Sequence, residues 1–176
     1  QVNNLPGELP FTFEVVYGKQ DSIQLIIHNG SERIPVKSIR YGRDKATAKD
    51  TIYATFEGYD TYLTAIFEER LMEGYWHVSY RDNYKIRFKA FYGDDRRFKL
   101  PAASHNENFS GRYKVLFSPG TEDEYPGIGD FTQQGNKLTG TFLTESGDYR
   151  YLEGNVSGNK ASLSCFDGSH AFLFEM

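Results

Sequence analysis

Hydrophobic and polar residues alternate with a period of two along most of the chain, in short runs rich in β-branched and aromatic residues. Phe11–Tyr17 and Ile23–His28 are typical of strands. Asn29-Gly30, ahead of Glu32–Ile39, predicts a two-residue hairpin, because both turn residues need positive φ. The pattern predicts further strands at Thr51–Phe56, Tyr75–Tyr80, Lys85–Tyr92, Arg112–Phe117, Gly129–Gln134, Lys137–Thr144, Tyr149–Val156, Lys160–Phe166 and Ala171–Glu175. Only Tyr59–Glu73 is expected to hold a helical turn or two.

About twelve short strands, spaced by roughly 8–12 residues, predict an all-β fold with few or no helices. We expect either an antiparallel up-and-down barrel or a strongly curved sandwich. The segments Phe109–Tyr113 and Leu138–Phe142 look like strand starts of avidin- and lipocalin-type barrels, a likeness of architecture alone. Leu100–Asn108 is the best internal boundary. We therefore expect a single domain with two β-rich halves, about residues 1–100 and 108–176.

Composition narrows the classes of partner. The 176 residues include 20 Lys and Arg against 24 Asp and Glu, which gives a formal net charge of −4. Nucleic acids and anionic membranes select concentrated positive charge, so no nucleic-acid partner is expected. Aromatic residues make up 16% of the chain, as suits a β-rich core. Because the chain starts at Gln1 without an apolar signal region, we expect a processed or trimmed product.

Metal, redox and nucleophile motifs are missing from the sequence. The single cysteine, Cys165, alternates with Leu163 and is expected to be a buried hydrophobe without a disulfide or Cys-x-x-Cys partner. The four histidines have no metal-ligand spacing, so no metal site and no cofactor are predicted; they are His28, His77, His105 and His170. No catalytic residue is predicted either, since the usual nucleophile and phosphate-binding motifs are absent. The mixed-sign run Asp94–Arg97 is typical of a turn with local ion pairs.

The densest polar pattern is Gly147–Gly154. With a period of two, Arg150 shares a face with Leu152 and is expected to point into the barrel, where a buried guanidinium needs a carboxylate such as Asp167. One interpretation is a ligand-anchoring group of Arg150, Asp167 and His170, with Asp148 beside it. The other is an internal ion pair with Asp167-Gly168 as a hairpin turn, and general principles favour this second interpretation.

Parts of the chain also resemble a known family. Gly140–Thr144, Gly147–Gly154 and Leu163–Phe174 together resemble the N-terminal β domain that precedes the thioredoxin-fold domain in cell-envelope, TlpA-like and peroxiredoxin-like disulfide reductases of Gram-negative bacteria. The same pattern is matched more loosely by Leu9–Glu14, Asn29–Ile34, Gly74–Trp76 and Arg97-Phe98. The resemblance covers most of the chain and is most specific in its C-terminal third.

The resemblance implies an exported protein, periplasmic or associated with the outer membrane, and often attached by an N-terminal lipid anchor. It implies a non-catalytic accessory domain that makes protein–protein contacts, with a thioredoxin-like domain as its partner or covalent neighbour. The thioredoxin-fold domain is absent from this chain, so no catalytic residue is carried over and no enzyme activity is expected. The alternative is a small-molecule or carbohydrate-binding β-barrel module that acts without a redox domain.

Overall fold

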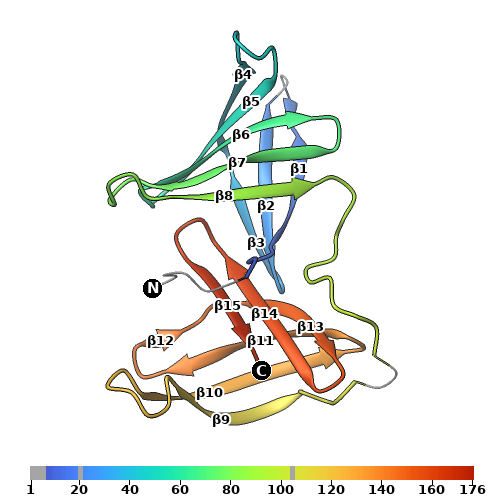
Figure 1. Cartoon of the computed structure of the whole chain (residues 1–176), viewed down its shortest axis with the longest axis vertical. Coiled ribbons are helices and arrows are strands. Elements are labelled where there is room, and N and C mark those ends of the chain that lie inside the picture. The colour runs from blue at the N-terminus through green and yellow to red at the C-terminus, as the bar shows by residue number, and fades with distance from the viewer. Residues whose placement is uncertain (1–6, 20–21, 104–105) are drawn as a thin grey trace.

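The computed structural model describes residues 7–19, 22–103 and 106–176, so His105 lies outside the described residues. These residues form three antiparallel sheets (Figure 1). The first sheet contains β1 (Thr12–Tyr17), β2 (Ile23–Asn29) and β3 (Glu32–Val36). The second contains β4 (Ser38–Arg43), β5 (Asp50–Phe56), β6 (Thr61–Glu68), β7 (Leu71–Val78) and β8 (Lys85–Phe91).

The third sheet has the order β15-β14-β13-β11-β10-β9, with β12 paired to β11. Its strands are β9 (Gly111–Phe117), β10 (Tyr125–Gln134), β11 (Lys137–Thr144), β12 (Gly147–Asp148), β13 (Leu152–Ser157), β14 (Lys160–Phe166) and β15 (Ala171–Glu175). The predicted all-β class is confirmed, and the expected hairpin between β2 and β3 forms. Its turn residues were predicted one position too early: Asn29 is the last residue of β2 and pairs with Glu32, so the turn is Gly30-Ser31, and of Asn29 and Gly30 only Gly30 has positive φ.

Of the two expected architectures, the closed barrel is not formed. The two end strands of the third sheet, β9 and β15, are not paired with each other. Instead, Phe117 of β9 and Phe174 of β15 meet in an aromatic cluster, with ring centroids 6.2 Å apart. Aromatic side chains of the two end strands therefore meet although the strands are not hydrogen-bonded to each other.

The helical turns expected within Tyr59–Glu73 are absent, and that prediction was wrong. The segment forms most of the β6–β7 hairpin. Along β6, Thr61, Leu63 and Ala65 are buried, whereas the residues between them are only partly buried. This period of two, together with β-branched and aromatic side chains, outweighs any helical tendency.

Apolar side chains form two separate cores. One core lies between the first and second sheets, and the other lies on the inner face of the third sheet. Phe166 belongs to β14 of the third sheet but is buried in the first core, and Ala171 of β15 packs against that core as well. Figure 1 shows how the β14–β15 hairpin reaches out of the third sheet toward the other two.

The tip of that hairpin fits its position closely. The Phe166 side chain is 3% exposed, and its ring lies 4.4 Å from Phe11 and 5.3 Å from Trp76, measured between centroids. Gly168 has φ +94°, and a Cβ at this position would lie 2.1 Å from Phe56. Its carbonyl oxygen accepts hydrogen bonds from the Thr61 hydroxyl and the Trp76 indole. The hairpin tip therefore docks the third sheet onto the other two.

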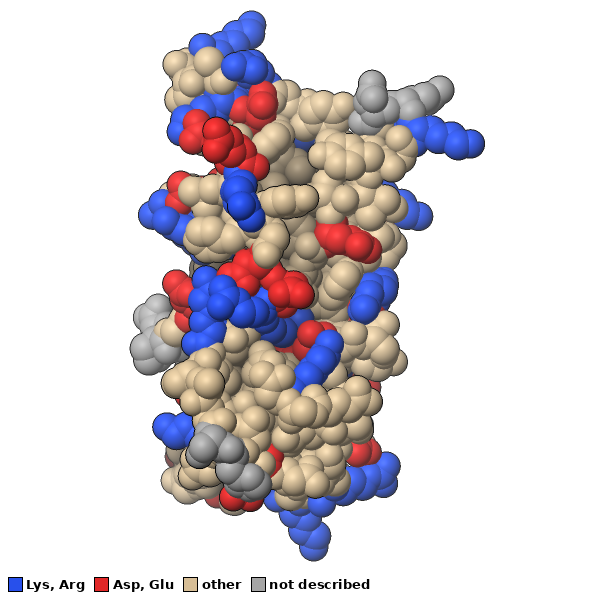
Figure 2. Space-filling view, turned by 90° about the vertical axis from the view of Figure 1, so that its right-hand side faces the viewer, with Lys and Arg blue, Asp and Glu red and all other residues tan. Residues whose placement is uncertain are grey.

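Charged side chains of the two signs are intermixed at the surface rather than gathered by sign. On the face in Figure 2, Lys and Arg side chains lie beside Asp and Glu side chains. Asp94 shows this mixing at the level of residues, because it contacts both Arg96 at 2.8 Å and Lys99 at 3.2 Å. Both cations hold the pKa of Asp94 well below its usual range, with the hydrogen bond from Arg96 the largest cause.

Candidate functional site

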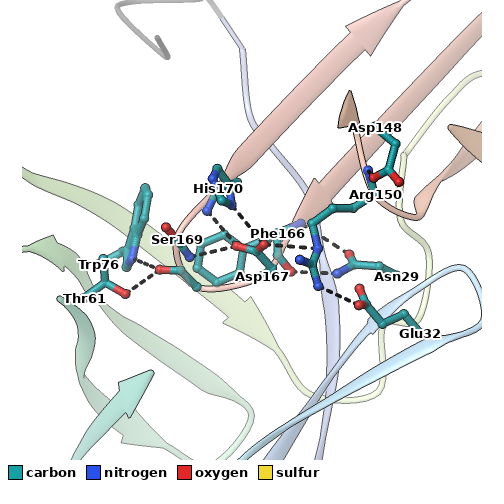
Figure 3. A network of polar contacts seen from close by, with 11 residues as sticks. Asn29, Glu32, Thr61, Trp76, Asp148, Arg150, Phe166, Asp167, Ser169 and His170 are labelled. Atoms are coloured by element: carbon teal, nitrogen blue, oxygen red, sulfur yellow. Dashed lines mark hydrogen bonds and ion pairs between the residues drawn. The ribbon is translucent and has the colours of Figure 1, made fainter. Parts of the chain in front are cut away.

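The structure brings all four predicted site residues together, at the junction of the third sheet with the β2–β3 hairpin (Figure 3). Asp167 Oδ2 lies 3.2 Å from Arg150 Nε and 3.0 Å from His170 Nδ1. Asp148 Oδ1 accepts a hydrogen bond of 2.8 Å from the backbone N–H of Arg150. We call Arg150, Asp167, His170 and Glu32 the junction network. Ligand binding by the four predicted residues, Asp148, Arg150, Asp167 and His170, stays a prediction.

Arg150 does not point into a barrel beside Leu152, so that orientation was wrong. Arg150 lies between β12 and β13 with φ +57°, outside any strand. The side chain of Asp148 binds the backbone two residues ahead, a local turn that competes with the strand ladder. Leu152 is fully buried, whereas the Arg150 side chain is 35% exposed and reaches Glu32 Oε1 at 2.7 Å.

In the junction network one guanidinium, that of Arg150, lies between two carboxylates. Burial lowers the pKa of Arg150, but the carboxylates of Glu32 and Asp167 together raise it by more, so its net pKa lies above the ordinary value. The guanidinium therefore stays charged between two carboxylates. Among the described residues, Arg150 Nε and Glu32 Oε2 are buried without a hydrogen bond, since the 3.2 Å contact of Nε with Asp167 has ion-pair distance only.

Asp167 is occupied mainly by its own hairpin. It is 1% exposed, and its Oδ1 accepts hydrogen bonds from the backbone N–H groups of Ser169 and His170, at 2.8 and 2.7 Å. Asp167-Gly168 thus forms the turn between β14 and β15, and the carboxylate closes it. The backbone and ion-pair contacts use both oxygens of this carboxylate, which leaves it poorly placed to bind a ligand.

Sequence reasoning missed a buried cation near the junction network, Arg97. It is 5% exposed and donates hydrogen bonds to the Ser164 side chain, the His28 carbonyl and the Asn29 side chain, at 2.8 to 2.9 Å. Burial lowers the pKa of Arg97, a shift that the charge of Glu153 opposes. The predicted local ion pairing holds for Arg96 alone. Nothing in a pair of adjacent arginines indicates which one turns inward.

The other reactive side chains are either buried or scattered. Cys165 is fully buried, as expected, and burial raises the pKa of its thiol to about 12. Across the part of the chain that the structure describes, no group of three His, Cys, Asp or Glu side chains is placed to hold a metal ion. No described helix has the length and apolar character needed to span a bilayer.

A cavity of about 310 Å³ opens beside the junction network, between β12 and β15. We call it the aromatic cup; it is lined by Tyr125, Thr144, Ser146, Gly147, Asp148, Tyr149 and Phe172. The Tyr149 ring lies 4.9 Å from Phe172, and its hydroxyl is hydrogen-bonded to that of Tyr125. Burial and this hydrogen bond raise the pKa of Tyr149 to about 12. Of the four predicted site residues, only Asp148 lines the cup.

A second hollow, of about 630 Å³, lies on the second sheet and includes Tyr53 and Tyr75 among its lining residues. Here the aromatic side chains stack on one another across strands. Tyr62 stacks on Tyr53 at 4.9 Å and on His77 at 4.4 Å, and the Arg40 guanidinium lies 4.6 Å from the centroid of the Tyr53 ring. The rings of Tyr53 and Tyr62 are therefore stacked on neighbouring side chains within the sheet.

No protein-family model, curated protein or solved structure matches this chain.

Proposed function

We propose that this chain is a non-catalytic binding module that takes a small organic cation in the aromatic cup. The observation that carries the proposal is the lining of the cup, which combines three aromatic rings with the Asp148 carboxylate and contains no Lys or Arg. Aromatic faces and a carboxylate both attract a positive charge, and quaternary ammonium groups are favoured ligands of such cages.

The volume of the cup and a free carboxylate oxygen of Asp148 fit this chemistry. A volume of about 310 Å³ lies at the lower end of ligand pockets and suits a ligand of few heavy atoms. Asp148 is exposed and uses one oxygen for the Arg150 backbone N–H, while no described residue donates a hydrogen bond to the other. That second oxygen is therefore free to pair with a cation.

In this proposal the junction network positions the cup rather than binding the ligand. The Arg150 backbone holds Asp148, and the Arg150 guanidinium is held by Glu32 and Asp167. On the opposite wall, His170 stacks on Phe172 with ring centroids 5.6 Å apart. Arg150 thus holds Asp148 in place and His170 holds Phe172 in place, without either residue lining the cup.

Titration with choline tests the proposal, and the neutral isostere 3,3-dimethylbutan-1-ol serves as the matched probe. We expect choline to bind and its affinity to fall at least about tenfold in Asp148→Asn, since a charge-assisted contact is lost. The exposed loop residue Asp123 provides the control, and Asp123→Asn should leave the affinity unchanged. Equal affinity for the two probes, or full affinity in Asp148→Asn, would refute the cation site.

An exposed apolar patch favours a second candidate function, the accessory domain of an exported thioredoxin-family reductase. On the third sheet, Leu116 lies opposite Pro126 and Ile128 lies opposite Leu143. The exposed fractions of Leu116, Ile128 and Leu143 are 51%, 45% and 40%. Contiguous apolar residues at the surface are typical of protein-binding sites.

The accessory role is tested by the intact mass of the native protein, with peptide mapping, from its own cells. A much larger mass with Cys-x-x-Cys peptides supports it, and a mass near 20.2 kDa, apart from a lipid, contradicts a covalent redox domain. The chain by itself should show no thiol–disulfide turnover, because one buried cysteine cannot complete the dithiol cycle. Turnover would refute the non-catalytic assignment.

A further inference from the structure

We propose that β15 is a self-association edge, which pairs antiparallel with β15 of a second copy of this chain. The proposal goes beyond ligand binding in the cup and does not depend on it. It rests on the direction of the backbone groups of β15, on the residues that protect the other sheet edges, and on the symmetry of the β15 sequence.

The backbone groups of alternate β15 residues point away from the sheet. Met176 and Ala161 exchange both backbone hydrogen bonds, and His170 accepts one from Asp167. In an antiparallel ladder the bonding direction alternates, so Phe172 and Phe174 also bond toward β14. The N–H and C=O groups of Ala171, Leu173 and Glu175 therefore face outward, where no described strand pairs with them.

β15 also differs from the other edge strands in its side chains. Exposed edges are commonly protected by charged residues or proline within the strand. β1, β3, β4, β8 and β9 each carry at least one such residue, namely Glu14, Pro35, Arg40, Arg87 and Lys114. β15 has the sequence Ala-Phe-Leu-Phe-Glu, with no charge before its last residue. Of the edges described, this one is the least protected against pairing.

The sequence of β15 is complementary to itself when two copies run antiparallel about Leu173. In that register Leu173 faces its own copy, and Ala171 faces the second copy's Glu175, so all outward backbone groups meet as hydrogen-bonded pairs. Phe172 then lies opposite the second copy's Phe174, an aromatic cross-strand pair formed twice. The two Glu175 carboxylates are four residues apart along the ladder, about 14 Å, which keeps their repulsion screened.

The expected dimer is weak, because one pair of edge strands buries less surface than a standard interface. Sedimentation velocity of the ligand-free chain from about 10 μM to about 1 mM should show a concentration-dependent dimer. Hydrogen exchange over the same range should show rising protection of the Ala171, Leu173 and Glu175 amides. The Phe172 and Phe174 amides, which bond to β14, should be protected throughout.

Two variants at one position break the pairing in different ways. Leu173→Pro removes an outward N–H without removing a β14 ladder bond, and edge strands tolerate proline in this orientation. Leu173→Lys places like charges opposite each other on the symmetry axis and covers the case in which the proline variant does not fold. Both should be monomeric over the whole range. The control Leu116→Lys, in the apolar patch, should still dimerise.

Three outcomes would overturn the proposal. The first is a monomer at every concentration. The second is a dimer that persists in Leu173→Lys or is lost in Leu116→Lys, which would place the interface elsewhere. The third is protection of the Leu173 amide that does not depend on concentration, which would mean that this edge is already covered within one chain.

Discussion

The junction network and the aromatic cup are neighbours along the chain but differ in how their polar atoms are used. Asp167 in the junction is 1% exposed and bonds to its own turn and to Arg150. Asp148 in the cup is exposed and, among the described residues, bonds to one backbone N–H alone. A carboxylate saturated by its own chain stabilises the fold, whereas one with a free oxygen beside aromatic rings is available to a ligand.

The largest difference in the free energy of unfolding should appear between substitutions of two aromatic residues: Phe166, at the hairpin tip beside the junction network, and Phe172, which lines the cup. Phe166→Ala should lower the free energy of unfolding by about 3–5 kcal/mol, because it empties a fully buried position between the sheets. Phe172→Ala should cost less, since Phe172 is only partly buried at the edge of the cup. Urea unfolding of both variants measures the difference. Equal losses would contradict the conclusion that the β14–β15 tip docks the third sheet onto the other two.

Removal of the Asp167 carboxylate should lower the free energy of unfolding more than removal of the Asp148 carboxylate, by a smaller margin than for the two aromatic residues. Asp167→Ala should cost about 2–4 kcal/mol, because it removes the turn bonds and leaves Arg150 with one fewer partner. Asp148→Ala should change stability by no more than about 1 kcal/mol, as for an exposed turn residue. The same unfolding curves give both values. A loss in Asp148→Ala as large as that in Asp167→Ala would make the cup a structural element too.

The smallest effect concerns alkaline pH. The pKa of Tyr149 is about 12 in the folded chain and about 10 in the unfolded chain, so the folded state holds the proton more tightly. The resulting stability is fully present below about pH 10 and is lost as pH rises toward about 12. Tyr149→Phe should therefore flatten the fall of stability over this window. Cys165, whose pKa is also raised, is present in both proteins and cancels in the comparison.

An unchanged slope in Tyr149→Phe would show that burial and the hydrogen bond with Tyr125 do not hold the phenol neutral. Tyr17→Phe is the control, because Tyr17 is 77% exposed and should leave the slope as it is.

Much of the fold could be predicted from local pattern, since the period of two fixes which residues of a strand share a face. The same pattern placed Asp167-Gly168 in a turn and Cys165 in the core. Arg150 was misplaced because its backbone N–H donates a hydrogen bond to the Asp148 side chain, which interrupts the alternation. The docking of Phe166 into the other core could not be predicted, because it depends on how two sheets meet and not on the residues beside it.

The most direct test of the account is a map of backbone amide chemical shifts during a choline titration of the unmodified chain. The account predicts saturable changes at Asp148, Tyr149 and Phe172, with little change at Glu32 and Asp167. Changes centred on Glu32, Arg150 and Asp167 would make the junction network the binding site and contradict the division drawn between the two regions. Absence of any change would contradict the cation site itself.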